Sequence, residues 1–226
     1  MWVIHFGVTM RKVIHVIIFA LVLIESNALA FDLFGKSQKD FQYDADIVRA
    51  KHLKYYGELI AEYKRVTGSY PFMEDAQVPI YVFIATPKQL PKGYPEQRAP
   101  FKHKIGSVSY FFSVLAKELN REIPECYDPQ YVSSNGRPNY YMYVANKGSY
   151  FFAVHFHNNM PFAKNVAKNY YKVDISNTPT EMNMAKDPFS LFKSSEFIEV
   201  INRPMKKQGF FEEREQLTIS ASKSGR

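Results

Sequence analysis

The 226 residues carry 29 Lys and Arg against 22 Asp and Glu, a net charge of +7, and 16% of them are aromatic. This length suits one domain or at most two small ones, and the charge favours anionic partners such as an acidic protein or a cell-envelope polymer. The single cysteine, Cys126, excludes an internal disulfide, and the missing G-x-G-x-x-G and G-x-x-x-x-G-K patterns leave nucleotide binding without support.

The first 30 residues have the order of a secretory signal peptide. Arg11 and Lys12 precede a 12-residue apolar stretch, Val13 to Ile24, that only His15 interrupts, and Ala28-Leu29-Ala30 supplies the small residues of a cleavage site. A spanning helix needs about 20 apolar residues, so we expect cleavage after Ala30 rather than a membrane anchor. Translation starting at Met10 would give a shorter signal of the same kind. We therefore expect an exported, soluble mature protein, periplasmic rather than extracellular, with a net charge of +6.

A long amphipathic helix is expected near the start of the mature chain. Residues 31–43 are interpreted as a flexible entry segment, and Asp44 or Asp46 as the N-cap of a helix over 45–67. Apolar residues recur every three or four positions along one face of this segment. Gly68 is expected to end the helix in a left-handed conformation, and Tyr70-Pro71 to prevent its continuation.

The middle of the chain predicts a buried strand and a second helix. Residues 78–86 (VPIYVFIAT) are β-branched and aromatic, which is typical of a strand. Four prolines within residues 87–104 indicate an extended loop. Residues 107–120 predict a helix capped by Ser107, and residues 121–138 are expected to be irregular.

A β-hairpin is the clearest tertiary signal. Two aromatic runs, residues 139–145 and 149–157, flank Asn146-Lys147-Gly148, where Gly148 suits a positive φ. A three-residue loop pairing Ala145 with Ser149 is preferred over a two-residue loop. In that register Tyr141 and Tyr143 share a face with Phe151, Ala153 and His155.

The remaining segments complete an α+β domain. We expect a short helix or turn at 161–168, a strand at 170–176, helices near 188–202 and 206–217, and a disordered tail at 218–226. The order of elements predicts a single domain over 44–217. It consists of a small, largely antiparallel sheet with helices packed on one face.

His155-Phe156-His157 is the one pattern with metal-ligand character. Residues two apart on a strand project from the same face, so both imidazoles could hold one ion, with zinc as the candidate. A further ligand is required, and His52, His103 and Asp174 are candidates without diagnostic spacing. Two histidines that merely pack on the sheet are the commoner case, because metal sites need a fuller ligand set.

Nucleophilic catalysis has little support in the sequence. Cys126 with a histidine base would need a thiolate held near an imidazole, and a lone cysteine is more often a buried apolar residue. No G-x-S-x-G occurs, and the two Ser-x-x-Lys matches, at Ser190 and Ser220, are the kind expected by chance.

An aromatic surface is the other candidate site. Tyr141, Tyr143 and Phe151, with Tyr127 and Tyr131, would contact a partner if this face of the sheet is exposed, whereas helices covering the face would make it core. We expect a non-enzymatic exported binding protein that uses an aromatic and basic surface on an acidic protein or anionic envelope partner, for instance as an inhibitor or immunity-type protein. Nucleic acid is not an expected partner. A metal-dependent envelope hydrolase using His155 and His157 is the alternative.

Overall fold

The computed structural model describes residues 39–74, 76–87, 89–90, 102–129, 139–168, 170–177 and 188–206. The chain divides into two compact units, Met1–Phe41 and Gln42–Arg226, and the architecture below is that of the second unit. The predicted signal peptide, most of the entry segment, the helix predicted from residue 206 and the tail at 218–226 lie outside the described residues. Among the helices of the described ranges, none combines the length and the apolar character that crossing a membrane requires.

The long amphipathic helix is confirmed, with an earlier start than the capping pattern predicts. Residues 39–67 are helical, and Gly68 follows at φ 81°, with its N–H bonded to the Lys64 carbonyl at 2.9 Å. The prediction that Asp44 or Asp46 caps the helix is wrong, because both lie inside it and both are fully buried. Their carboxylates instead accept hydrogen bonds from distant backbone groups, Asp44 from Lys206 and Asp46 from His157 and Asn158.

The sheet has six strands in the order β2-β1-β3-β4-β6-β5. The strands are β1 (Ile80–Ile84), β2 (Lys104–Ile105), β3 (Tyr141–Asn146), β4 (Ser149–Phe156), β5 (Lys164–Ala167) and β6 (Tyr170–Ser176). All neighbours are antiparallel except β1 and β2, which are parallel. The α+β class is thus confirmed, with a sheet that is mixed and larger than predicted.

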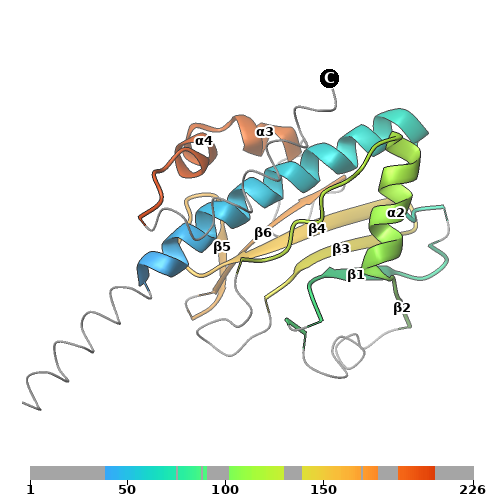
Figure 1. The fold of residues 1–226 in the computed structure, drawn as a ribbon. Helices are drawn as coiled ribbons and strands as arrows, with labels where there is room; N and C mark the ends of the chain where they lie inside the picture. The colour runs from blue at the N-terminus through green and yellow to red at the C-terminus, as the bar shows by residue number, and fades with distance from the viewer. Residues whose placement is uncertain are drawn as a thin grey trace, which may run out of the picture. The chain divides into compact units, whose positions relative to one another are not determined.

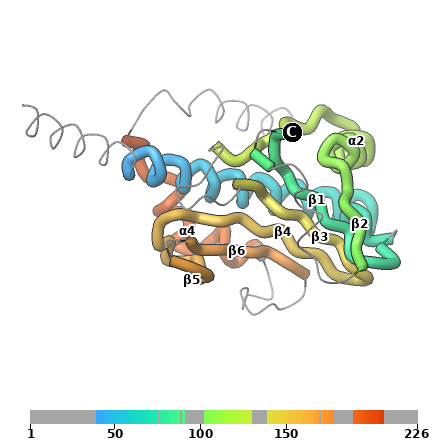
Figure 2. The backbone as a smooth tube through the Cα atoms, turned by 90° about the horizontal axis from the view of Figure 1, so that it is seen from below, coloured from blue at the N-terminus to red at the C-terminus, as the bar shows by residue number. Residues whose placement is uncertain are grey.

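The helices of the described ranges pack on one face of this sheet, which we call the inner face (Figures 1 and 2). Tyr56 of the long helix lies 4.9 Å from Phe152 of β4 between ring centroids. The helix α2 (Val108–Leu119) places Phe111 5.1 Å from Tyr143 of β3. Ser107 caps α2 as predicted, its side chain accepting a hydrogen bond from the Tyr110 N–H.

Two short helices complete the inner layer. The single helix predicted near 188–202 is two helices, α3 (Pro188–Lys193) and α4 (Ser195–Ile201). The break comes at Ser194, which caps α4 by accepting from the Phe197 N–H at 3.2 Å. The absence of a side chain at Gly57 of the long helix allows Phe192 of α3 to pack closely, because a Cβ at that position would lie 2.6 Å from the Phe192 ring.

The hairpin is confirmed but its predicted register is wrong. Lys147 and Gly148 form a two-residue loop, and Ala145 pairs with Tyr150 instead of Ser149. Gly148 adopts φ 76°, and the Asn177 side chain bridges the turn by donating to the Gly148 carbonyl and accepting from the Tyr150 N–H. This register places the most aromatic positions of both strands under the helices, which buries more apolar area than the predicted pairing.

The segment 161–168 also differs from its prediction. Residues 164–167 form β5, an edge strand with a bulge between Asn165 and Ala167. Its sequence, KNVA, does not alternate apolar and polar residues, and most of the strand is exposed. Pairing with β6 therefore determines its conformation rather than local propensity. The strand predicted at 170–176 is confirmed as β6.

Candidate functional site

The face of the sheet opposite the helices, which we call the outer face, carries aromatic and cationic side chains. Strand alternation and the observed register place Tyr81 and Phe83 of β1, Phe151 and His155 of β4, and Tyr170 and Lys172 of β6 on this face. Tyr140, which precedes β3, and His103, which precedes β2, join them through ring contacts. In the described ranges, no helix packs against these residues (Figure 2).

Six of these rings form a continuous row across the sheet, which we call the ring row. Its members in spatial order are His103, Tyr81, Phe83, Tyr140, His155 and Tyr170. The successive centroid distances are 5.5, 6.1, 5.1, 6.1 and 4.6 Å. These separations fall in the range of attractive aromatic pairs, so each ring restrains the next. Four members are half-buried, so part of each of these rings reaches the surface, whereas Phe83 and Tyr170 are buried.

Cationic side chains flank the β6 end of the ring row. Lys172 is the direct cross-strand partner of both His155 in β4 and Lys164 in β5. Like charges directly opposite each other destabilise a sheet, so the Lys164–Lys172 pairing has an energetic cost. The Lys172 ammonium lies 5.4 Å over the Phe151 ring and 3.7 Å from the Asp174 carboxylate, and the side chain is 17% exposed. The outer face thus places two lysines beside aromatic rings, one of them paired with Asp174.

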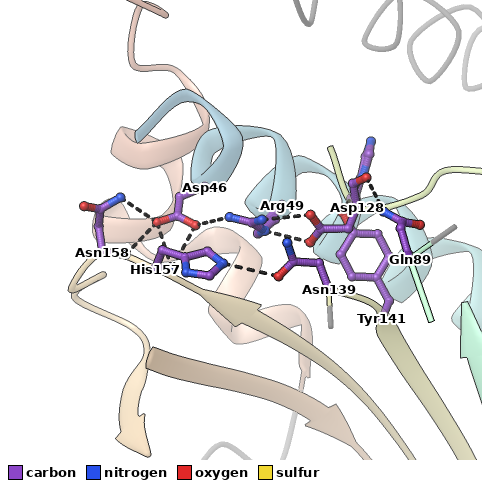
Figure 3. Close-up of polar contacts among 9 residues, drawn as sticks. Asp46, Arg49, Gln89, Asp128, Asn139, Tyr141, His157 and Asn158 are labelled. Carbon is purple, nitrogen blue, oxygen red and sulfur yellow. Dashed lines mark hydrogen bonds and ion pairs between the residues drawn. The ribbon is translucent and has the colours of Figure 1, made fainter. Parts of the chain in front are cut away.

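A buried polar network lies at the end of β4, between the sheet and the long helix (Figure 3). Its centre is Arg49 of the long helix, which is completely buried. Arg49 donates from Nε and Nη2 to the two carboxylate oxygens of Asp128, at 2.7 and 2.8 Å, and from Nη1 to Asp46 at 2.7 Å. Burial by itself would lower the pKa of Arg49, but Asp128 and then Asp46 raise it above its ordinary value. The guanidinium is therefore permanently charged and bidentate.

Asp46 connects this network to the end of β4. Its carboxylate accepts from the backbone N–H groups of His157 and Asn158, at 3.1 and 2.7 Å, and from the Asn158 side chain at 2.8 Å. Burial raises the pKa of the Asp46 carboxyl, while Arg49 and these donors oppose the rise. Every one of these hydrogen bonds ends on a carboxylate oxygen, as an ionised acid requires. The helix and the strand end are consequently locked to each other.

His157 is the neutral member of the network. Its Nε2 lies 3.3 Å from the Asn139 side-chain oxygen, which places the proton on Nε2, and its buried Nδ1 has no hydrogen-bond partner in the part of the chain that the structure describes. Burial, and after it the charge of Arg49, lowers the pKa of His157 to about 3. His157 is therefore uncharged at neutral pH and is unsuited to act as a general base on a solvent-exposed substrate.

The network supports the fold and does not present a reactive group. Arg49 and Asp46 are fully buried, Asp128 is 3% exposed, and each of their charges is engaged by a neighbour. Gln89 extends the network by donating to the Asp128 carbonyl at 2.8 Å. The outer face, by contrast, carries half-buried rings and the exposed Lys164.

The predicted aromatic surface is divided between the two faces. Tyr141 and Tyr143 are fully buried on the inner face, where the Tyr143 hydroxyl donates to the Pro71 carbonyl at 2.7 Å. Phe151 lies on the outer face because of the two-residue hairpin loop. Tyr127 is half-buried and its hydroxyl donates to the Glu125 carboxylate, and Tyr131 lies outside the described residues. Of this set, only Phe151 lies beside the ring row and Lys172.

His155 lies in β4 and His157 just beyond its end, and both contact Tyr170, at 4.6 and 6.1 Å between ring centroids. Lys172 lies opposite His155, and burial followed by the charge of Arg49 lowers the pKa of His157. Within the described ranges, no three His, Cys, Asp or Glu side chains come close enough together to hold a metal ion. The metal-site hypothesis stays a prediction without geometric support.

Cys126 is buried and belongs to the hydrophobic core. Its backbone N–H and carbonyl both bond the Tyr56 hydroxyl, at 3.2 and 2.5 Å. These contacts fix the irregular segment that carries Asp128 against the long helix. They assign Cys126 a packing position in the core.

Arg49, Asp128 and the ring row were not predicted as site features from the sequence. One signal was available for Arg49, since it and Asp46 are three residues apart inside an otherwise apolar stretch of the helix. Asp128 and Tyr140 carry no comparable signal, because only the tertiary fold brings them to their partners. In comparisons with known proteins, no family model matches the chain, and no curated protein or solved structure matches it either.

Proposed function

We propose that this chain is an exported, non-enzymatic binding protein that holds an anionic glycan of the cell envelope on the outer face of its sheet. The observation that carries the proposal is the ring row, six aromatic and imidazole rings in unbroken contact, with Lys172 and Lys164 at one end. The predicted signal peptide supports the compartment, and the net charge of +6 expected for the mature protein supports an anionic ligand.

A glycan suits this face because its repeating unit is itself a ring. One side of a pyranose presents C–H groups that pack on flat aromatic rings, and its edge presents hydroxyls for the Tyr and His polar atoms. Tyr81, Tyr140 and His155 are half-buried members of the ring row that offer such rings. An acidic polypeptide would satisfy the lysines but would leave the ring row without a matching repeat, so we favour the glycan over an acidic protein.

Rigid support makes the ring row a preorganised surface. Its members stand on paired strands, and the buried Asp46–Arg49–Asp128 network fixes the end of β4 just beyond His155. A surface that is already ordered loses less conformational entropy when it binds. Charge-lined surfaces also accelerate the encounter with an oppositely charged ligand.

Binding of defined oligomers by the purified protein tests this proposal. We expect an oligogalacturonate, a linear glycan with one carboxylate per sugar, to bind more tightly than neutral maltohexaose or a polyglutamate of equal charge. Equal binding of polyglutamate would show that charge alone decides and would favour an acidic protein partner. Binding of oligothymidylate as tight as that of the glycan would equally overturn the proposal.

Variants connect the binding to the outer face. Tyr140→Leu removes one ring of the row, and Tyr110→Leu, on the exposed side of α2, is its matched control. We expect Tyr140→Leu to weaken oligogalacturonate binding roughly 5- to 150-fold, the effect of about 1–3 kcal/mol. Tyr110→Leu should leave it unchanged. Equal effects of the two variants would contradict the outer-face site.

A further inference from the structure

A cleft of about 450 Å³ lies between α2 and the end of the long helix. Its walls are Tyr63 and Thr67 of the long helix, the turn that includes Tyr70, Phe72 and Glu74, and one side of α2 with Tyr110, Val114 and Glu118. The elements that form it are seen side by side at the α2 end of the structure in Figure 1. The volume is that of a site for a small ligand or a single side chain.

Tyr110 forms an aromatic platform in this cleft. Tyr110 is 56% exposed, and its ring stacks on the Phe72 ring with a centroid distance of 5.5 Å and an interplanar angle of 7°. Phe72 holds this position at φ 62°, a left-handed conformation that a bulky residue rarely adopts. The surrounding turn maintains it, with the Met73 N–H bonded to the Tyr70 carbonyl and the Tyr143 hydroxyl bonded to the Pro71 carbonyl. Backbone strain of this kind concentrates at ligand sites.

The cleft carries more acidic than basic side chains, whereas the whole chain has a positive net charge. Glu74 and Glu118 face one lysine, Lys117, which pairs with Glu118 at 3.2 Å. Glu74 is exposed and has no ion-pair or hydrogen-bond partner in the described ranges. An unpaired carboxylate beside an exposed aromatic face attracts a cation through both groups.

The local structure already shows a cation on an aromatic ring beside the cleft. The Lys64 ammonium lies 5.0 Å over the Tyr70 ring, at the opposite end of the same turn. Tyr70 is thereby occupied on that side, whereas the outward face of Tyr110 meets no other ring in the part of the chain that the structure describes. A second cation would therefore be received at Tyr110 and Glu74.

We propose that this cleft binds an organic ammonium group, with its alkyl body on Tyr110 and Val114 and its charge next to Glu74. A cation over an aromatic ring is stabilised by the ring quadrupole, and alkylated ammonium ions are the ligands that most often use such sites. The group would come from a small molecule of the choline type or from a lysine side chain of a peptide. This site is separate from the outer face and does not depend on the function proposed for it.

Calorimetric titration of the full protein with choline tests the site. The neutral isostere 3,3-dimethylbutan-1-ol has the same shape without the charge, so it should bind roughly 3- to 30-fold more weakly than choline. Equal binding of the two would show an apolar pocket without cation recognition and would overturn the proposal. Absence of choline binding, with Nα-acetyl-lysine methylamide also failing to bind, would overturn it too.

Variants separate the site from general effects on the fold. Glu74→Gln and Tyr110→Leu change exposed side chains, so both should fold, and each should weaken choline binding several-fold. Glu122→Gln removes an exposed carboxylate outside the cleft and should leave choline binding unchanged, as should Lys172→Gln on the outer face. An equal loss in Glu122→Gln would indicate a nonspecific charge effect and contradict the proposal.

The two sources of the ammonium group are distinguished by the ligands themselves. Tighter binding of choline than of Nα-acetyl-lysine methylamide assigns the site to a small molecule. The reverse order assigns it to a lysine side chain of a partner. Both orders agree with the site, and its loss in Glu74→Gln is required in either case.

Discussion

The imidazole of His155 stacks on the ring of Tyr170, with 4.6 Å between centroids and 15° between planes. This contact joins β4 to β6 and completes a row of rings that begins at His103, beside the opposite edge strand. The same two strands bring Lys172 directly opposite His155. Aromatic surface and positive charge therefore come from adjacent positions of one strand pair.

Replacing Lys172 should weaken the binding of an anionic glycan. It should also make that binding less sensitive to salt. Lys172→Gln removes one cation from the outer face, so oligogalacturonate binding should fall less steeply with added salt than in the natural protein. Binding measured at several salt concentrations gives the slope for each protein. Lys117→Gln, on α2, is the control and should keep the original slope. An unchanged slope in Lys172→Gln would remove Lys172 from the contact.

Breaking the buried network should destabilise the protein far more than breaking a surface ion pair. Asp128→Asn leaves the buried Arg49 with an incomplete partner, and we expect a loss of about 3–5 kcal/mol in the free energy of unfolding. Glu58→Gln breaks the exposed pair with Lys54, at 2.7 Å, and should cost at most about 1 kcal/mol. Urea unfolding of both variants measures the difference. Similar losses would show that the network does not lock the helix to the sheet.

The low pKa of His157 predicts a loss of stability in mild acid. The folded protein holds His157 neutral down to a pKa of about 3, whereas the unfolded chain takes up a proton below its ordinary pKa of about 6.5. Within that window the unfolded state binds more protons, so the contribution is complete above pH 6.5 and declines as the pH falls. One proton corresponds to a slope of about 1.4 kcal/mol per pH unit.

The variant His157→Gln isolates this contribution. Gln keeps a donor for Asn139 but does not titrate, so the difference in unfolding free energy between pH 7.5 and pH 5 should be smaller in the variant. Comparison of each protein with itself at the two pH values cancels the general cost of the substitution. Identical pH dependence of the two proteins would show that His157 titrates normally in the fold.

The hairpin turn should depend on a residue that tolerates positive φ at position 148. Gly148 has φ 76°, and an added Cβ would meet nothing within 4 Å, so backbone conformation alone determines the cost. Gly148→Ala should lower the free energy of unfolding by about 1–2 kcal/mol. Gly148→Asn should cost less, because Asn enters the left-handed region more readily. Thermal unfolding of both variants checks the order, and equal losses would point to a different turn geometry.

Local patterns predicted the elements that local chemistry determines. The end of the long helix at Gly68, the cap of α2 at Ser107 and the strand β6 follow from the conformational preference of glycine, a side-chain acceptor and β-branched residues. The packing of the helices on one face follows from the apolar spacing along residues 45–67. These features depend on residues that are close in the sequence, so they can be predicted from one sequence.

The features that escaped prediction depend on distant residues. Arg49 appears in the sequence as one more charged residue of a helix, and its burial requires Asp128, which lies 79 positions later. The hairpin register was decided by which rings the helices cover, and β5 by its pairing with β6. The ring row also needed that register, since a shift by one residue would have exchanged the two faces.

Hydrogen exchange of the protein with and without oligogalacturonate locates the binding surface. We expect added protection in β4, β6 and the residues around Tyr140, with no change in α2 and with the protection lost in Tyr140→Leu. Protection confined to α2 and the turn at residues 69–74, or none in the presence of bound glycan, would contradict the assignment of the outer face as the binding surface.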